Sequence, residues 1–171
     1  MTFMNDIKRK LRSYTACVNF TLVFILASLA ALILVITAIV NIDGEACEEM
    51  VLPRMAPSPF WCVLFWTLKM AIFGAALGIA MSVPTKNGAK KGIMAALGVS
   101  GAIICYSWIS LVYSAQSFLL AALVCAVLIA MSFLLFSMYK TVNPIAAVLM
   151  MIFCAWLLYI FYFSTALAFL S

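Results

Sequence analysis

Five long apolar runs, separated by short linkers, constrain the fold of this chain more than any other feature of its sequence. An α-helix needs about 20 residues to cross the hydrocarbon core of a bilayer, and each run is long enough. Within lipid, each run can satisfy its backbone hydrogen bonds only as a helix, because barrel strands would be shorter and would alternate polar with apolar residues. The predicted transmembrane helices cover residues 18–40, 60–83, 92–113, 118–139 and 144–170.

The composition has too few polar residues to form a sizeable water-soluble part. Apolar residues make up 68% of the 171 residues and charged residues only 9%, whereas a soluble domain carries about 25% charged residues. We therefore expect an all-α integral membrane protein with a single transmembrane domain over residues 1–171. The first run follows a basic segment, as in a signal peptide, but it is longer than the apolar core of such a peptide, so we interpret it as a membrane span.

Basic residues alternate from one linker to the next. The segment before the first run, the second linker and the fourth linker together carry eight Lys or Arg, whereas the first linker carries one and the third none. The positive-inside rule then predicts the N-terminus in the cytoplasm, the C-terminus outside and the acidic first linker outside. We expect the membrane to be a bacterial cytoplasmic membrane. The net charge of +5 thus indicates orientation, and we expect no nucleic-acid partner.

The predicted helices offer little for catalysis or metal binding. No Asp or Glu lies inside an apolar run, and the chain has no His, so acid-base catalysis and proton relays lack their usual groups. The six cysteines contain no C-x2-C pair, which argues against a zinc site. We therefore name no catalytic and no metal-binding residue. Cys47 and Cys62 come near the same membrane surface and either form a disulfide or remain two unbridged thiols. Serines inside the runs are interpreted as forming helix-to-helix or backbone hydrogen bonds: Ser107, Ser110, Ser132 and Ser164.

Lys69 is the one charged residue deep inside a predicted helix. An ionisable residue at such depth is a functional-site hypothesis by default. The alternative is a lysine whose apolar stem lets its ammonium reach the outer interface. The sequence leaves both interpretations open.

Aromatic residues gather on the second, third and fifth predicted helices. Because residues three and four apart share a helix face, two faces are predicted: Trp66, Lys69, Met70 and Phe73 on the second helix, and Trp156, Tyr159 and Phe163 on the fifth. Trp108 and Tyr113 both lie toward the outer end of the third helix, although their spacing puts them on different faces. We predict that the two faces and Trp108 enclose a flat aromatic ligand beneath the first linker by stacking. The alternative for each residue is ordinary packing or lipid contact.

Small residues recur on two of the helices. Gly74 and Gly78 form a G-x-x-x-G pattern on the second, and the third has a small-residue face that includes Gly98 and Gly101. Such faces allow close helix approach. We favour packing within one bundle as the explanation of these small residues. We also expect a homodimer held partly by the face of the third helix.

Several short motifs at preserved spacing resemble the TspO/MBR family of tryptophan-rich sensory proteins and translocator proteins. Trp66-Thr67 followed by Gly74 is similar to its W-T-x6-G motif. In the third helix Trp108 matches its N-x-x-W motif. The segment 143–147 looks like its S-P-L-A-A motif and the segment 155–159 like its A-W-x-x-F motif. The resemblance covers about residues 53 to 170.

This chain departs from the family pattern at several polar positions. Met70 stands where the family has a Tyr, Cys105 where it has an Asn, and Ser164 where it has an Asn late in the fifth helix. An Asp near the start of the fourth helix is replaced by apolar residues around Val124. These departures affect the groups that would give a ligand its polar contacts.

The resemblance implies a five-helix homodimer with a pocket between the helices under the first linker. It implies binding of porphyrins, haem-like tetrapyrroles, sterols or synthetic aromatic ligands, with no cofactor required. We expect a sensor or carrier that binds such a hydrophobic ligand, and Lys69 is the one intramembrane cation that could pair with a tetrapyrrole propionate. Two alternatives remain: a small structural or assembly subunit without a ligand, and an enzyme that degrades a bound tetrapyrrole.

Overall fold

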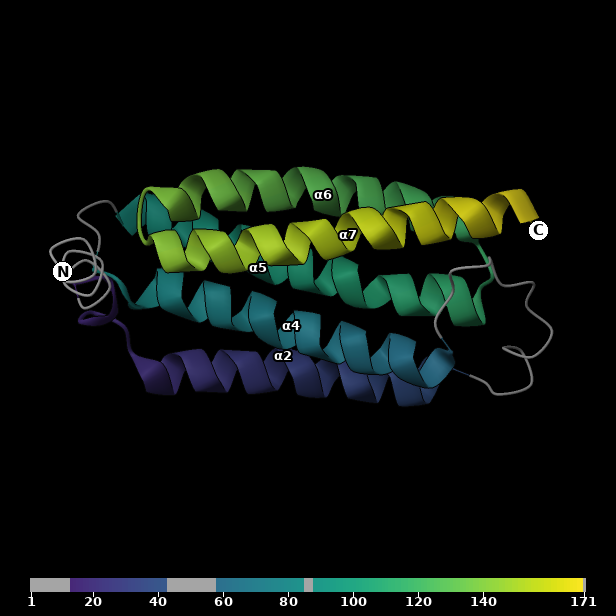
Figure 1. Cartoon of the computed structure of the whole chain (residues 1–171), viewed down its shortest axis with the longest axis horizontal. Helices are drawn as coiled ribbons and strands as arrows, with labels where there is room; N and C mark the ends of the chain where they lie inside the picture. Colours follow the sequence, from purple (N-terminus) through teal and green to yellow (C-terminus); the bar gives the residue numbers. More distant parts are fainter. Residues whose placement is uncertain (1–12, 43–57, 85–87, 171) are drawn as a thin grey trace, which may run out of the picture.

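The computed structural model describes residues 13–42, 58–84 and 88–170. In that part of the chain the structure contains five long helices and no strand (Figure 1). The helices are α2 (Phe20–Asn41), α4 (Pro59–Ser82), α5 (Gly88–Ile109), α6 (Phe118–Lys140) and α7 (Pro144–Leu170), and a π-helical turn, η1 (Ser110–Ser114), continues α5. All five are long and apolar enough to cross a membrane. The prediction of an all-α membrane protein with five spans is confirmed.

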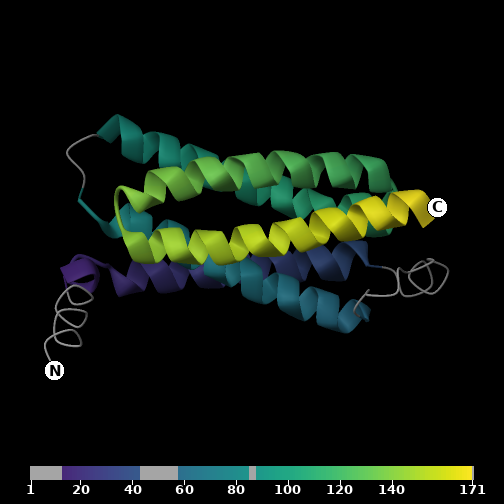
Figure 2. The ribbon, with the colours of Figure 1, turned by 45° about the horizontal axis from the view of Figure 1, so that its top comes forward.

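Consecutive helices run in opposite directions along one common axis, as Figures 1 and 2 both show. The most extensive packing joins α2 to α4 and α6 to α7, the pair α4–α7 connects these two halves, and α5 packs mainly on α6. In contrast, α4 and α5 meet at few places along their lengths. The two helices are held apart over most of their length, and large side chains fill the space between them.

Two asparagine side chains fix helix starts on the same end of the bundle. Asn19 accepts a hydrogen bond from the backbone N–H of Leu22 at 3.1 Å, as an N-cap residue does. Asn143, which is buried, accepts one from the N–H of Ile145 at 2.8 Å and donates to the carbonyl of Tyr14 at 3.0 Å. Asn143 therefore caps α7 and also ties its start to the segment that precedes α2.

The helix α5 differs most from its prediction. It begins at Gly88, whereas the predicted span began at residue 92, so Lys90 and Lys91 lie within its first turns. Their charges lower the local hydropathy on which the prediction relies, whereas the helix itself extends beyond the apolar run. Lys90 extends toward the end of α6, where its Nζ donates to the hydroxyl of Thr141 at 2.5 Å.

The glycines of the G-x-x-x-G pattern serve packing inside the bundle. A Cβ at Gly74 would lie 2.4 Å from the carbonyl oxygen of Leu26, and one at Gly78 would lie 2.7 Å from the Cα of Val23. Both contacts are with the backbone of α2, so only glycine permits this separation of α2 and α4. The interpretation of the pattern as packing within one bundle is confirmed.

The small residues of α5 also face their own bundle. Gly98 packs against the Leu77 side chain, and Gly101 is buried near Met131 and Phe73. A larger residue at either position would therefore act first on packing within the chain. The homodimer and its seam on the third predicted helix stay a prediction, and within the chain Gly98 and Gly101 already contact side chains of α4 and α6.

Cys47 and the acidic residues of the first linker lie outside the described residues. The alternatives of a disulfide or unbridged thiols for Cys47 and Cys62 therefore stay open. Trp61, at the start of α4, has 49% of its side chain exposed and stacks on Phe65 with ring centroids 5.9 Å apart. This agrees with an interfacial aromatic residue.

Candidate ligand-binding site

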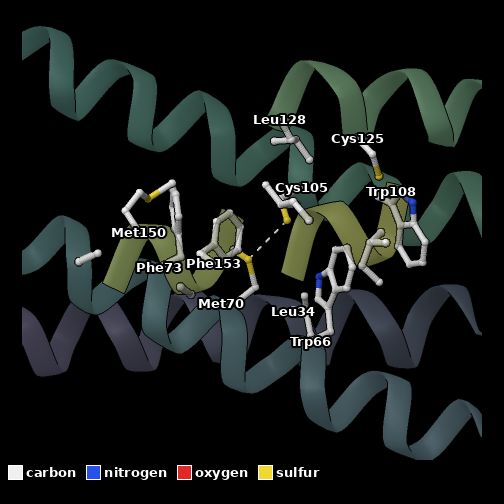
Figure 3. Packing of buried hydrophobic residues seen from close by; sticks show 14 of the residues in the cluster. Leu34, Trp66, Met70, Phe73, Cys105, Trp108, Cys125, Leu128, Met150 and Phe153 are labelled. Atoms are coloured by element: carbon white, nitrogen blue, oxygen red, sulfur yellow. Dashed lines mark hydrogen bonds between the residues drawn. The ribbon is translucent and has the colours of Figure 1, made fainter. Parts of the chain in front are cut away.

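Two tryptophans from different helices stack on each other at the centre of the site. The rings of Trp66 on α4 and Trp108 on α5 are nearly parallel, with an interplanar angle of 15° and centroids 4.6 Å apart. Only 2% of Trp66 and 1% of Trp108 is exposed. The stack thus fills the space between α4 and α5 at this level, as Figure 3 shows.

The α7 helix adds a second aromatic group beside the stack. Trp156 meets Trp66 edge-on, with centroids 6.1 Å apart, and contacts Tyr159 at 5.1 Å and Phe65 at 6.2 Å. Phe163 approaches Trp108 from the same helix, at 6.3 Å. The structure therefore brings together five of the predicted aromatic residues: Trp66, Trp108, Trp156, Tyr159 and Phe163. Phe65 also belongs to the group, and our prediction missed it because its spacing from Trp66 points it to another face.

Tyr113 joins the group against our expectation. Its ring lies edge-on to Trp108, with centroids 6.3 Å apart, and its hydroxyl donates to the Cys62 sulfur at 3.6 Å. A spacing of five residues separates the faces of an ordinary α-helix, but a π-helical turn has an i to i+5 repeat. Because Tyr113 lies within η1, the π-helical turn brings its ring to the side of Trp108, and the prediction of different faces is wrong.

Lys69 lies at the edge of the aromatic group. Its Nζ is 6.0 Å from the centroid of the Trp156 ring, within the range of a cation–π contact. The residue is partly exposed. Its ammonium is therefore on the Trp156 side of α4, where it can reach a ligand that contacts that ring.

Two indole N–H groups in this aromatic group have no acceptor. Among the described residues, the Nε1 atoms of Trp66 and Trp156 are buried and form no hydrogen bond. A buried donor without a partner is destabilising by about 1–3 kcal/mol. These two unsatisfied donors favour a ligand that carries an oxygen acceptor.

Met70 and Phe73, the other two predicted residues, lie deeper in the bundle. The thiol of Cys105 on α5 donates to the Met70 sulfur at 3.5 Å, and both residues are buried. Phe73 contacts Phe153 on α7, with centroids 4.9 Å apart. It also lines an apolar groove of about 190 Å³ between α2, α4 and α5, together with Leu26, Ala30 and Tyr106. Phe73 thus contacts α7 and the groove rather than the Trp stack, and its place in the ligand pocket stays a prediction.

The fold and the site define a small five-span membrane protein with a tryptophan-rich interior between α4, α5 and α7. The TspO/MBR family model matches residues 19–170, nearly the whole chain. The chain belongs to the TspO/MBR family. A search of curated proteins found no match.

Proposed function

We propose that this protein binds a flat, carboxylate-bearing aromatic ligand of the tetrapyrrole class at the Trp66–Trp108 contact, as a sensor or carrier. The observation that carries the proposal is the stack itself: two nearly parallel indoles, 4.6 Å apart, supplied by α4 and α5, which approach each other closely at few places. A planar ring that enters between them exchanges one indole–indole contact for two indole–ligand contacts. Offset stacking of this kind contributes about 0.5–1.5 kcal/mol for each ring pair beyond the burial of area.

The polar groups beside the stack support the same ligand class. Lys69 lies beside the Trp156 ring, and the N–H groups of Trp66 and Trp156 have no acceptor among the described residues. A ligand carboxylate would accept from these donors and would balance the Lys69 charge. A purely apolar ligand, such as a sterol ring system, would leave all three groups unpaired.

The test is a titration of the purified protein in lipid nanodiscs with protoporphyrin IX, followed by quenching of tryptophan fluorescence. We expect saturable binding by the unaltered protein and a clear loss of affinity for Trp108→Ala, which removes one wall of the stack. Trp61→Ala is the matched control, since Trp61 lies outside the stack. Absence of saturable binding would favour the alternative of a structural subunit, and equal losses for the two variants would place the ligand elsewhere.

A further inference from the structure

The apolar groove between α2, α4 and α5 is a second candidate site, with a volume of about 190 Å³. Buried small residues from all three helices line it: Ala30, Gly74 and Gly98. Exposed apolar side chains stand beside them: Leu29, Ile33, Val99 and Ile103. Because the three helices are membrane spans by length and composition, the groove opens toward the hydrocarbon of the bilayer.

The lining of the groove makes no polar demand on an occupant. The hydroxyl of Tyr106 already donates to the carbonyl of Ala30 at 2.9 Å, and the other lining residues are apolar or glycine. A ligand with polar atoms at this level would leave them without hydrogen-bond partners, which is destabilising. The groove therefore selects a hydrocarbon.

The dimensions of the groove fit one extended alkyl chain. Its lining on α2 runs from Leu26 to Ile33, which is about 10.5 Å along the helix at 1.5 Å per residue. A volume of about 190 Å³ over that length gives a mean cross-section of about 18 Å². Carbon atoms of neighbouring chains approach to about 3.5–4.0 Å, so one polymethylene chain needs about 12–16 Å².

A second copy of the chain fits the groove less well. A helix with its side chains is about 10–12 Å wide, which is too thick to enter a channel of this cross-section. The groove has twelve lining residues, whereas a stable protein interface takes about 20–30 residues from each partner. The groove alone therefore does not make a dimer seam, and a lipid chain is the better occupant.

Lys91 lies on the face of α5 that lines the groove. It precedes Gly98 by seven residues and Ala102 by eleven, which are two and three helical turns, and it is partly exposed. Tyr106, the last lining residue of α5, is about 22 Å from Lys91 along the helix. One leaflet with its headgroups is equally deep, since a whole bilayer measures about 40–45 Å. A phosphate at Lys91 and a chain in the groove can therefore belong to one lipid.

The charge at this end of the bundle favours an anionic headgroup. Lys90 and Lys91 lie in the first turns of α5, and Lys140 ends α6 at the same end. Four of the five acidic residues of the chain lie in the linker that joins the other ends of α2 and α4. Basic residues next to a membrane surface attract anionic lipids.

We propose that the groove binds one acyl chain of an anionic phospholipid of the phosphatidylglycerol kind, and that Lys91 pairs with its phosphate. This site is separate from the Trp66–Trp108 stack, so it stands whether or not the stack binds a ligand.

The test uses phosphatidylglycerol with a diazirine near the methyl end of one acyl chain. The probe is present in trace amounts in phosphatidylcholine nanodiscs that hold the purified protein, and peptide mass spectrometry locates the lipid attached after illumination. We expect adducts concentrated on the groove residues of α2 and α5, and displacement of the probe by excess unlabelled phosphatidylglycerol. Adducts spread over all five helices in proportion to exposure would overturn the proposal. A groove that stays unlabelled, as it would under a second copy of the chain, would overturn it too.

Two pairs of variants test the two parts of the site. Lys91→Gln should lower labelling of the groove by about fivefold, the effect of one basic residue beside an anionic headgroup. Lys90→Gln is the matched control, because Lys90 extends to Thr141 of α6, and it should change labelling much less. Ala102→Phe should fill the groove and abolish labelling there. Ala96→Phe, at an exposed position of α5 outside the groove, should leave labelling intact.

The lysine pair keeps the proposal falsifiable if Ala102→Phe does not fold. Equal losses for Lys90→Gln and Lys91→Gln would show a general effect of charge and would overturn the pairing with Lys91. Equal labelling of the groove by a phosphatidylcholine probe with the same diazirine would overturn the preference for an anionic lipid.

Discussion

The indole N–H of Trp108 on α5 donates a hydrogen bond of 2.8 Å to the hydroxyl of Ser164 on α7. Ser164 in turn donates to the carbonyl of Ile160 at 2.9 Å, and Trp108 and Ser164 are buried. One indole of the stack is thereby held at a fixed angle by the neighbouring helix, while the N–H of the other, Trp66, has no acceptor in the described part of the chain. The two indoles of the site therefore differ in hydrogen bonding. The N–H of Trp108 is already bonded to Ser164, whereas the N–H of Trp66 can still donate to a ligand.

Ser164→Ala should destabilise the bundle. The change removes the acceptor of a buried N–H, and leaving such a donor unsatisfied costs about 1–3 kcal/mol. The measurement is the thermal unfolding midpoint in a fixed mild detergent, which should fall. Ser137→Ala is the control, because Ser137 is exposed and bonds only to the carbonyl of Phe133. Equal midpoints for the two variants would mean that the Trp108 hydrogen bond contributes nothing to stability.

Gly74→Ala should disrupt the packing of α2 on α4. Alanine gains up to about 1 kcal/mol of helix propensity over glycine, yet its methyl would sit 2.4 Å from a backbone carbonyl oxygen of α2. We expect a net loss of stability, because neither backbone can yield without moving a whole helix. Chemical or thermal unfolding in detergent measures the difference.

Two other glycines of the chain extend this prediction to a rank order of stabilities. At Gly98 the new methyl meets a flexible Leu77 side chain at 2.9 Å, and at Gly92 it meets nothing within 4 Å. The order of stability should therefore be Gly92→Ala above Gly98→Ala, and Gly98→Ala above Gly74→Ala. An unchanged midpoint for Gly74→Ala would show that α2 is not held against α4 at this distance.

Lys69→Met should discriminate between porphyrin acids and their esters. Lys69 Nζ lies 6.0 Å from the centroid of the Trp156 ring, so it can pair with a carboxylate of a ligand beside that ring. Removing the cation should weaken binding of protoporphyrin IX and leave its dimethyl ester nearly unchanged. Trp156→Ala should weaken both, because it removes contact area. Equal shifts of acid and ester in Lys69→Met would mean that Lys69 extends to the interface, away from the ligand.

The orientation of the bundle is predicted from charge alone. Lys90, Lys91 and Lys140 lie at the end of the bundle at which α2 begins, and the positive-inside rule places that end in the cytoplasm. In intact cells, trypsin added outside should therefore leave the linker between α4 and α5 uncut. In inside-out vesicles it should cut there. Cleavage in intact cells would invert the predicted topology.

The helices could be predicted from the sequence because hydropathy and length decide where a chain crosses lipid. The predicted bounds of the last two helices, 118–139 and 144–170, differ from the observed ones by one residue in all. The start of α5 was missed because Lys90 and Lys91 interrupt the apolar pattern without interrupting the helix. The antiparallel order followed from the short linkers.

The site could be predicted only in part, because periodicity describes one helix at a time. It placed Trp66 and Met70 on one face of α4, but it could not show that Cys105 of α5 lies against Met70. That contact depends on the register between two helices. The position of Tyr113 was wrong because a 3.6-residue repeat was assumed where the backbone forms a π-turn. Ser164 was correctly interpreted as a hydrogen-bonding residue, yet its partner Trp108 was not foreseen.

The most direct test of the account is circular dichroism of the stacked indoles during a titration with metal-free protoporphyrin IX. Two nearly parallel indoles 4.6 Å apart are close enough for their excited states to couple, and Trp108→Phe should remove that signal while Trp61→Phe keeps it. If the ligand enters between Trp66 and Trp108, the coupled signal of the unaltered protein should decline in proportion to the bound fraction. Saturation with ligand while the coupled signal stays intact would contradict the account.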